Sequence, residues 1–502
     1  MAWQPQGPAP LPNFREWVPD WLRVPLYVLL LIGFQWSNGM YFTAFEQMKG
    51  GLSITQSDVV MMGQTVLIGL SFYFPLAFRL KFRFQNKWSL FAAACGQIVC
   101  NLLFPHLTVM PLRLLVCYAG GFFRLYGTFE CFSNILGRVT PTYNYAVFLS
   151  FVFFIVIGCV NVIDIAATQL IYHYDWQMLH TFSVGYLLFM LLLILVFWRT
   201  FRPMPKMPLL GISWIGMATW SIFILSLVYV AAYGEELGWL HHTHIRVALC
   251  MASLSLAYGI WAMYNRRHPF ICREAFQLRH FWVIMAIFLL LCILLATQHV
   301  LQATYFGAFL HLDVLASARM KWFDFLGQAL GALFCWQVLV RKLIRPKYMM
   351  LIAFSCIGIY LLSMQQLLSY QAPTSAFCLP LVVCGFGHVM VFIVLTVYVQ
   401  ATANFTYYFQ MLCLLGFVRT GVGDPLGEAI WERGLHALIP YNGLLDSLRE
   451  LYGWAFLVCV IALLVILITR FSFGIRSITP RLRSIYHSAS LGLQHFPRRR
   501  PS

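Results

Sequence analysis

Charged residues are scarce in this 502-residue chain. Asp, Glu, Lys and Arg make up only 10% of it, whereas 61% of its residues are hydrophobic. A soluble globular domain carries roughly 25% charged residues, and no soluble fold would hide this much apolar surface. The composition therefore excludes an ordinary soluble protein and predicts a polytopic membrane protein.

Motifs for ATP hydrolysis, metal binding and secretion are also missing. The chain has no GxxxxGK[ST] phosphate loop, so we do not expect ATP-driven pumping by this chain alone. Its 14 cysteines show no CxxC or zinc spacing, which indicates small core side chains and no metal site. The Pro-rich start lacks a basic region followed by a cleavage site, and we interpret it as a cytoplasmic tail.

Long apolar runs fill the rest of the chain. A spanning helix needs about 20 largely apolar residues, and about fourteen segments meet this test. We predict spans at 24–45, 58–78, 88–105, 112–136, 145–171, 178–198, 209–232, 245–264, 281–310, 318–340, 348–368, 376–400, 405–431 and 453–475. The longest loop on the side opposite the termini, at 432–452, is expected to hold one or two helical turns.

These spans predict an all-α membrane protein with two six-helix bundles and a central inserted helix pair. We expect an N-terminal tail at 1–23, a first bundle at 24–205 and the inserted pair at 206–264. A second bundle is expected at 265–475 and a basic C-terminal tail at 476–502.

Positive charge predicts the orientation. With both termini on one side, the loops and tails of that side hold most of the 34 Lys and Arg residues. Such loops are normally cytoplasmic, so both termini are expected in the cytoplasm. The net charge of +17 is explained in the same way, and the expected partner is the lipid bilayer, with no nucleic acid.

Four stretches carry a family resemblance. They are YGEELGWLHHTHIRVAL (233–249), HPFICREAFQLRHF (268–281), CGFGHVMVF followed by GFVRTGVGDPLGEAI, and YHYDWQMLHTF (172–182). Taken in their order along the chain, they resemble the major facilitator superfamily, and more narrowly its fourteen-span drug:proton antiporter branch of the EmrB/QacA type.

The resemblance implies secondary active transport, with proton-coupled efflux of a small amphipathic compound by alternating access. It implies no covalent chemistry and no cofactor. A multispan membrane enzyme, such as an acyltransferase, is an alternative, but no His–acid pair falls at a membrane boundary in an enzyme-like setting, so we expect no enzymatic activity. The resemblance also implies the bacterial cytoplasmic (inner) membrane as the location, and a periplasmic adaptor protein and an outer-membrane channel as partners.

The chain also departs from the family. Arg83 and Lys87 fall on basic positions of the conformational loop between the second and third spans, but Phe78 and Phe82 replace its Gly and Asp. Half of the latch that this loop provides is therefore missing, and Ser37 replaces an acid in the first span. These losses favour an alternative function, a transporter-derived protein that binds a ligand or acts as a scaffold without proton-coupled transport.

Several ionisable residues fall inside predicted spans. A charge at mid-bilayer costs at least about 2.5–3.5 kcal/mol on insertion scales, so such residues normally face a cavity or a partner. The candidates are Arg124, Glu130, Asp164, Arg419, Asp424 and Glu428.

Asp164 and Glu130 are the first candidates for proton coupling. Asp164 stands alone in the fifth span, and a lone carboxylate shielded from water favours its protonated form. Arg124 lies two helical turns from Cys117, which replaces a family arginine, and is a candidate to take over its role. The alternative is a static pair between Arg124 and an acid that holds the fourth and fifth spans together.

Asp424 and Glu428 form a second candidate coupling site. They are four residues apart and therefore face one way. Between them, Pro425 frees the carbonyl near Gly421 and predicts a kink there. Arg419 falls on the family pattern, and we expect it to pair with an acid of the bundle.

The ninth predicted span carries a polar face that is a candidate for substrate contact. Gln298 and Gln302 share this face, and His299 lies beside them, either as a contact or as a satisfied core histidine. Gln64 is a further candidate. Aromatic residues make up 17% of the chain, which suits a cavity for amphipathic or cationic ligands, although lipid contact explains many of them equally well.

Overall fold

The computed structural model describes residues 13–52, 54–140, 145–201, 209, 212–266, 268–278, 280–341, 343–370, 372–403 and 405–469. Its first half holds α1 (Asp20–Leu52), α2 (Gln56–Tyr73), η1 (Phe74–Leu76), α3 (Ala77–Arg83), α4 (Asn86–Leu103), η2 (Phe104–His106), α5 (Met110–Val139), α6 (Tyr145–His173) and α7 (Gln177–Phe197). Next come α8 (Trp214–Tyr233), η4 (Trp239–His241), α9 (Thr243–Asn265) and α10 (Arg273–Phe276). The second half holds α11 (Phe281–Thr297), η5 (Gln298–Gln302), α12 (Ala303–Ala308), α13 (Val314–Arg341), α14 (Pro346–Leu367), η6 (Thr374–Phe377), α15 (Cys378–Thr402), α16 (Phe405–Phe417), η7 (Val418–Gly423) and α17 (Asp424–Ile468).

The helices are long because a backbone in lipid must satisfy its hydrogen bonds within one segment. Eleven helices of the described chain are long and apolar enough to cross a membrane. Helices α1 and α5 have the length as well, and the 62-residue run Tyr407–Ile468 holds two segments. The fourteen predicted spans therefore correspond to fourteen helical segments, within a few residues at most ends.

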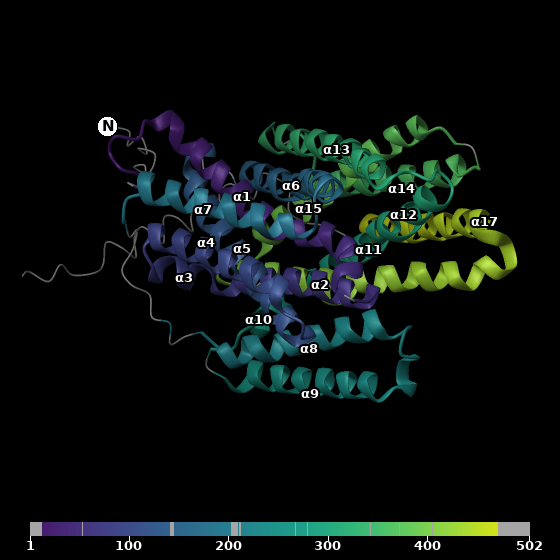
Figure 1. Cartoon of the computed structure of the whole chain (residues 1–502), viewed down its shortest axis with the longest axis horizontal. Helices are drawn as coiled ribbons and strands as arrows, with labels where there is room; N and C mark the ends of the chain where they lie inside the picture. The colour runs from purple at the N-terminus through teal and green to yellow at the C-terminus, as the bar shows by residue number, and fades with distance from the viewer. Residues whose placement is uncertain are drawn as a thin grey trace, which may run out of the picture.

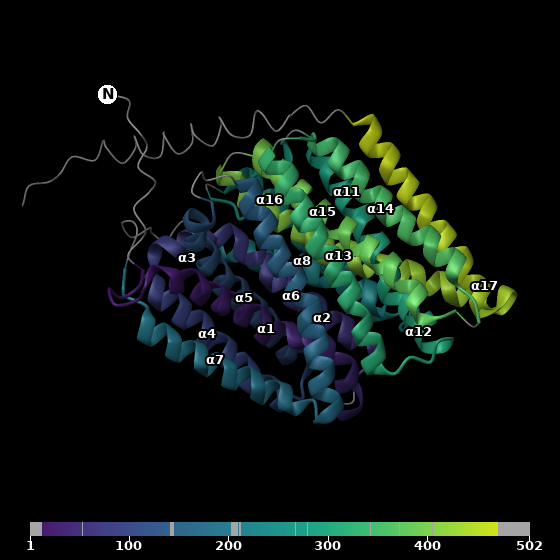
Figure 2. The same cartoon turned by 90° about the horizontal axis from the view of Figure 1, so that it is seen from above.

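Two bundles make up the body of the molecule. In the first half, α5 packs against α1, α2 and α4, while α6 packs against α1 and α7 against α4. In the second half, α15 packs between α13 and α14, and α17 packs against α11 and α14. Figure 2 shows the purple-to-blue first half and the green-to-yellow second half side by side.

Helices α8 and α9 form the inserted pair. They pack along each other, and α8 rests on α2, η7 and α17, so the pair lies against the outside of both bundles (Figure 1). Tyr233 of α8 donates a hydrogen bond to Asp58, which caps the start of α2 together with Thr55. Most of α9 is exposed, as expected for a helix that faces lipid.

Helix α17 corrects the prediction of a loop at 432–452. The whole stretch is helical except at Gly443, whose φ of 74° and ψ of 167° break the helix into two segments. Only glycine adopts this backbone conformation without strain, so a single residue makes the turn that a loop was expected to make.

Part of the predicted N-terminal tail also belongs to the first bundle. Phe14 is buried, and its ring lies 5.1 Å from Tyr27 and 4.7 Å from Trp198. Helix α1 then begins at Asp20. The first twelve residues of the predicted N-terminal tail and the whole predicted C-terminal tail at 476–502 lie outside the described residues.

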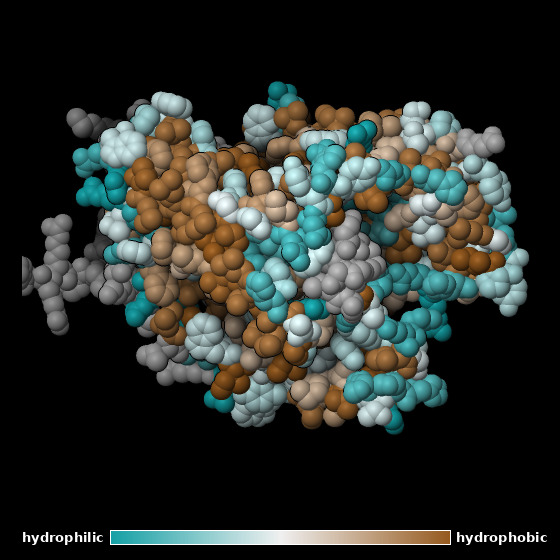
Figure 3. Space-filling model, viewed as in Figure 1, coloured by the Kyte–Doolittle hydropathy of each residue, from teal (hydrophilic) through white to brown (hydrophobic). Residues whose placement is uncertain are grey.

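The two ends of the molecule differ in charge. Helix ends that carry Arg83, Lys87, Arg199, Arg266 and Arg345 gather where α1 begins, which we call the basic end (Figure 1). The bend at Gly443 and α12 lie at the other end, which we call the opposite end. Apolar side chains cover much of the face between them (Figure 3), as a lipid-facing surface requires.

Candidate functional site

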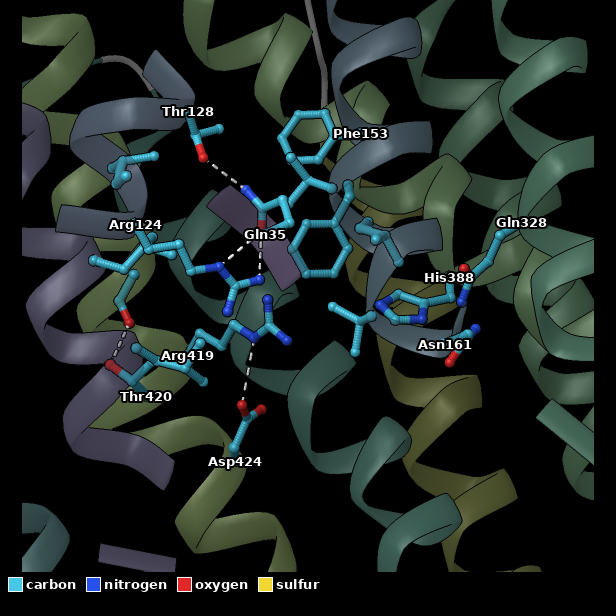
Figure 4. A pocket seen from close by; sticks show the side chains of 18 of the residues that line it. Gln35, Arg124, Thr128, Phe153, Asn161, Gln328, His388, Arg419, Thr420 and Asp424 are labelled. Atoms are coloured by element: carbon cyan, nitrogen blue, oxygen red, sulfur yellow. Dashed lines mark hydrogen bonds and ion pairs between the residues drawn. The ribbon is translucent and has the colours of Figure 1, made fainter. Parts of the chain in front are cut away.

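A cavity of about 1800 Å³ lies between the two bundles. Helices α1, α2, η1, α3, α5 and α6 of the first half line it, together with α11, η5, α12, α13, α15, α16, η7 and α17 of the second. Most of its wall is apolar and aromatic, so its few charged side chains stand out. Figure 4 labels nine charged or polar side chains of this wall: Gln35, Arg124, Thr128, Asn161, Gln328, His388, Arg419, Thr420 and Asp424.

Arg124 of α5 is buried in the wall of this cavity. Its Nε donates to Oε1 of Gln35 on α1 at 2.7 Å, and a terminal nitrogen donates to the same oxygen. Gln35 in turn donates to Thr128 at 3.0 Å. The partner of Arg124 is thus a neutral amide on α1, and not the acid of the alternative in which a static pair holds the fourth and fifth spans together.

Arg419 lies in the π-helical turn η7. Its Nε lies 3.4 Å from Oδ2 of Asp424, and its guanidinium group lies 5.4 Å from the centre of the Phe392 ring. The acid is on the same helix, five residues away, and not elsewhere in the bundle. Where Pro425 predicted a kink, the chain has a π-helical turn, and the N–H of Asp424 donates to the carbonyl of Arg419 at its end.

Asp164 does not stand alone, which corrects the sequence-based expectation. It forms an ion pair with Lys321 of α13, in the other half of the chain, and both side chains line the cavity. The antiparallel packing of α6 on α13 brings the two together. Lys321 is 157 residues away in sequence, so no local pattern predicts this pair.

Asp324 was missed as a candidate. It lies one turn from Lys321 and faces the cavity, where Nδ2 of Asn161 donates to its Oδ2 at 2.7 Å and Nε2 of Gln328 at 2.6 Å. A signal was present in the sequence, because Lys321 and Asp324 are two charges three residues apart inside the predicted span 318–340.

Glu130 lies behind the cavity wall. Its side chain lies 3.8 Å from Nζ of Lys81 on α3 and accepts a hydrogen bond from Asn134 at 3.2 Å. Lys81 also bonds to the Ser133 hydroxyl. Glu130 therefore meets α3 and not α6, and it belongs to a polar cluster near the basic end.

Three acids of α17 form a row along the cavity. Asp424, Glu428 and Glu432 follow one another at intervals of four residues, and all three line it. The shared face of Asp424 and Glu428 that the spacing indicated is confirmed. Glu432, one turn further toward the opposite end, was assigned to a loop and so was missed.

The polar face of the ninth span lies on the π-helical turn η5. Gln298, His299 and Gln302 all line the cavity, as does Gln64 of α2. Gln302 accepts a hydrogen bond from the Tyr360 hydroxyl at 2.8 Å, and Gln298 donates to Sγ of Cys384 at 3.3 Å. His388 lines the cavity as well (Figure 4).

The predicted conformational loop between the second and third spans contains α3, and it makes an aromatic contact with α16. Phe78 of α3 packs edge-on against Phe409 of α16, with ring centres 4.5 Å apart, and Phe409 also contacts Phe129. Arg83 ends α3, and Nζ of Lys87 donates to the carbonyl of Leu195 at 3.0 Å. Both basic residues thus lie at the basic end, outside the cavity.

Within the described part of the chain, no group of three or more His, Cys, Asp or Glu residues is arranged to hold a metal ion.

The sequence matches no known family model and no curated protein. Solved structures are nevertheless similar. A peptide transporter of the POT family, in complex with sulfate, shares 14% identity and a TM-score of 0.57, covering 91% of this chain and 96% of that one. The nucleoside transporter NupG shares 14% identity and a TM-score of 0.54, covering 89% and 99%.

The human organic anion transporter MFSD10 (TETRAN) shares 11% identity and a TM-score of 0.51, covering 89% of this chain and 100% of that one. At such low identity the likeness shows the fold alone. The chain has the major facilitator fold.

Proposed function

We propose that this chain is a secondary active transporter that moves a small molecule by alternating access. The observation that carries the proposal is the central cavity, which is lined by polar and charged side chains from both bundles. A ligand held there contacts both halves, so rocking of one bundle against the other would expose it first to one side of the membrane and then to the other.

Protons are the proposed driving ion. Asp164, Asp324, Asp424 and Glu428 are carboxylates that face the cavity, and a carboxylate that alternates between water and an occluded site binds and releases a proton. Asp164 is the strongest candidate because its partner Lys321 belongs to the other bundle. Glu130, which is not in the cavity wall and faces Lys81 of that wall, is the weakest.

Export of an amphipathic compound from a bacterial cytoplasm follows from the resemblance to the EmrB/QacA-like branch. The same resemblance supports an inner-membrane location and an adaptor and outer-membrane channel as partners. The collection of basic residues at one end supports cytoplasmic termini.

A ligand-binding protein or scaffold without proton-coupled transport is the second candidate function. The observation that favours it is the contact of Phe78 with Phe409, because an aromatic contact stands where the family has a polar latch between the halves.

Transport is tested with purified full-length chain in liposomes that contain a pH-sensitive dye. An imposed pH gradient should drive accumulation of an amphipathic probe together with proton movement, and an uncoupler should abolish both. We would use ethidium and 2-naphthoate as probes of opposite charge. A probe that binds the protein but neither accumulates nor moves protons would favour the second candidate.

A further inference from the structure

Two arginines from different halves of the chain face one another inside the cavity. Arg124 comes from α5 and Arg419 from η7, and Figure 4 shows their guanidinium groups pointing toward the same space. Arg124 is 3% exposed, whereas the side chain of Arg419 is 39% exposed, so the first is fixed in the wall and the second opens to the cavity.

The negative charge around this pair is incomplete. Among the side chains that the structure describes, no acid forms an ion pair with Arg124, whose partner Gln35 is neutral. Asp424 approaches Arg419 only at Nε, at 3.4 Å, and leaves the terminal nitrogens on the side of Arg124 (Figure 4). Two like charges that are shielded from water repel each other, and an uncompensated buried charge is costly.

We propose that the ligand of this cavity carries an oxyanion, a carboxylate or a phosphate, that binds between Arg124 and Arg419. The inference rests on the proposed function and names the substrate class of the same site. A guanidinium group presents two parallel N–H donors that match the two oxygens of such a group. An oxyanion between the two guanidinium groups would supply the negative charge that Gln35 and Asp424 do not provide.

Three aromatic rings beside the arginines define the rest of the ligand. Phe392 lies under Arg419, and its ring centre is 5.1 Å from that of Phe288 and 6.0 Å from that of Phe153. Phe153 belongs to the first half, and the other two belong to the second. The ligand is therefore an amphipathic anion whose apolar body rests on these rings.

This ligand would also connect the two bundles. Its oxyanion contacts α5 on one side and η7 on the other, so it would offset a repulsion that acts between the halves. The empty site would favour separation of the two arginines, and the occupied site would favour their approach. The row of acids on α17 would suit a cationic ligand instead. The test below distinguishes an anionic from a cationic ligand.

Binding is tested by thermal unfolding of the full-length chain in detergent, followed by a thiol-reactive dye that reports exposure of its buried cysteines. The probes share one aromatic body: 2-naphthoate, 2-naphthyl phosphate, neutral 2-naphthamide and cationic 2-naphthylmethylammonium. We expect at least one of the two anions to raise the unfolding temperature in a saturable manner. The neutral and cationic probes should not. Which anion acts identifies the headgroup.

Substitutions then assign the effect to the arginines. Arg419→Gln should raise the half-saturating concentration of the anion by about tenfold or more, while Arg419→Lys should retain part of the affinity. Arg246→Gln, on the exposed face of α9, is the matched control and should change nothing. Arg124→Gln should weaken anion binding as Arg419→Gln does. If the Arg124→Gln chain does not fold, Arg124→Lys is used in its place.

Equal or larger stabilisation by the cationic probe would overturn the inference, as would unchanged anion binding in Arg419→Gln. Failure of the proposed function gives a different result. Anion binding without any accumulation in liposomes would refute transport and leave this site intact, whereas accumulation of ethidium alone would support transport and refute the site.

Discussion

The two bundles touch in two chemically different ways. At the basic end, Phe78 of α3 meets Phe409 of α16 through aromatic rings. Along α6 and α13, the contact includes the Asp164–Lys321 ion pair and the bond from Asn161 to Asp324. An aromatic contact opens only by exposing apolar surface, but a polar contact can exchange its partners for water or a proton. We therefore expect protons to act on the α6–α13 contact and not on the aromatic one.

Asp164→Asn should have the largest effect on transport. The amide cannot carry a proton and leaves Lys321 without its counter-charge, so pH-driven accumulation should fall to the level of protein-free liposomes. Asp175→Asn, in the turn after α6, is the matched control and should behave like the unaltered chain. Accumulation that persists in Asp164→Asn and also survives the uncoupler would defeat proton coupling through this residue.

The double variant Asp424→Asn plus Glu428→Gln should reduce the rate of pH-driven accumulation without abolishing it. It removes the partial counter-charge of Arg419 and two of the three acids of the row, but leaves the α6–α13 contact intact. The initial rate in liposomes measures the effect, with exposed Glu236→Gln as the control. An unchanged rate would show that the two acids are not a relocated coupling site.

Phe409→Ala should affect stability more than pH dependence. Loss of a fully buried Phe costs about 3–5 kcal/mol, and the half-buried Phe409 should cost roughly half of that. The unfolding temperature measures the first effect and the pH profile of accumulation the second. Phe189→Ala, on the exposed face of α7, should change neither. A shifted pH profile in Phe409→Ala would remove the distinction between the two contacts.

The double variant Arg83→Gln plus Lys87→Gln should have the smallest effect. Lys87 makes one exposed hydrogen bond, and such surface substitutions usually change stability by less than about 0.5 kcal/mol. Unfolding temperature and transport rate should both stay within error. A large loss of transport would mean that these two residues still act as a latch despite the replacement of Gly and Asp by Phe78 and Phe82.

Much of the fold was predictable from the sequence, because hydrophobicity and helix length are local properties. The inserted helix pair, which lies between the two bundles in the sequence, and the polar face of Gln298, His299 and Gln302 were both anticipated. The turn at Gly443 was not, because one glycine in the left-handed region replaced a loop that the apolar count assigned to 432–452.

The sequence predicted several residues of the site but not which side chains interact with each other. Asp164, Arg124 and Arg419 were recognised because charges are costly inside apolar spans. Their partners Lys321, Gln35 and Asp424 depend on which helix faces meet, and only the last is close in sequence. Asp324 was missed although it shares a predicted span with Lys321.

The sequence by itself determined that this is a many-span membrane protein with its positive charge at one end, because each span is encoded by its own run of apolar residues. The tertiary structure decided what the buried charges do. Antiparallel packing of α6 on α13 gave Asp164 a partner from the other half of the chain. The approach of α5 to η7 placed two arginines at one point of the cavity, a juxtaposition that residues almost 300 positions apart acquire only by folding.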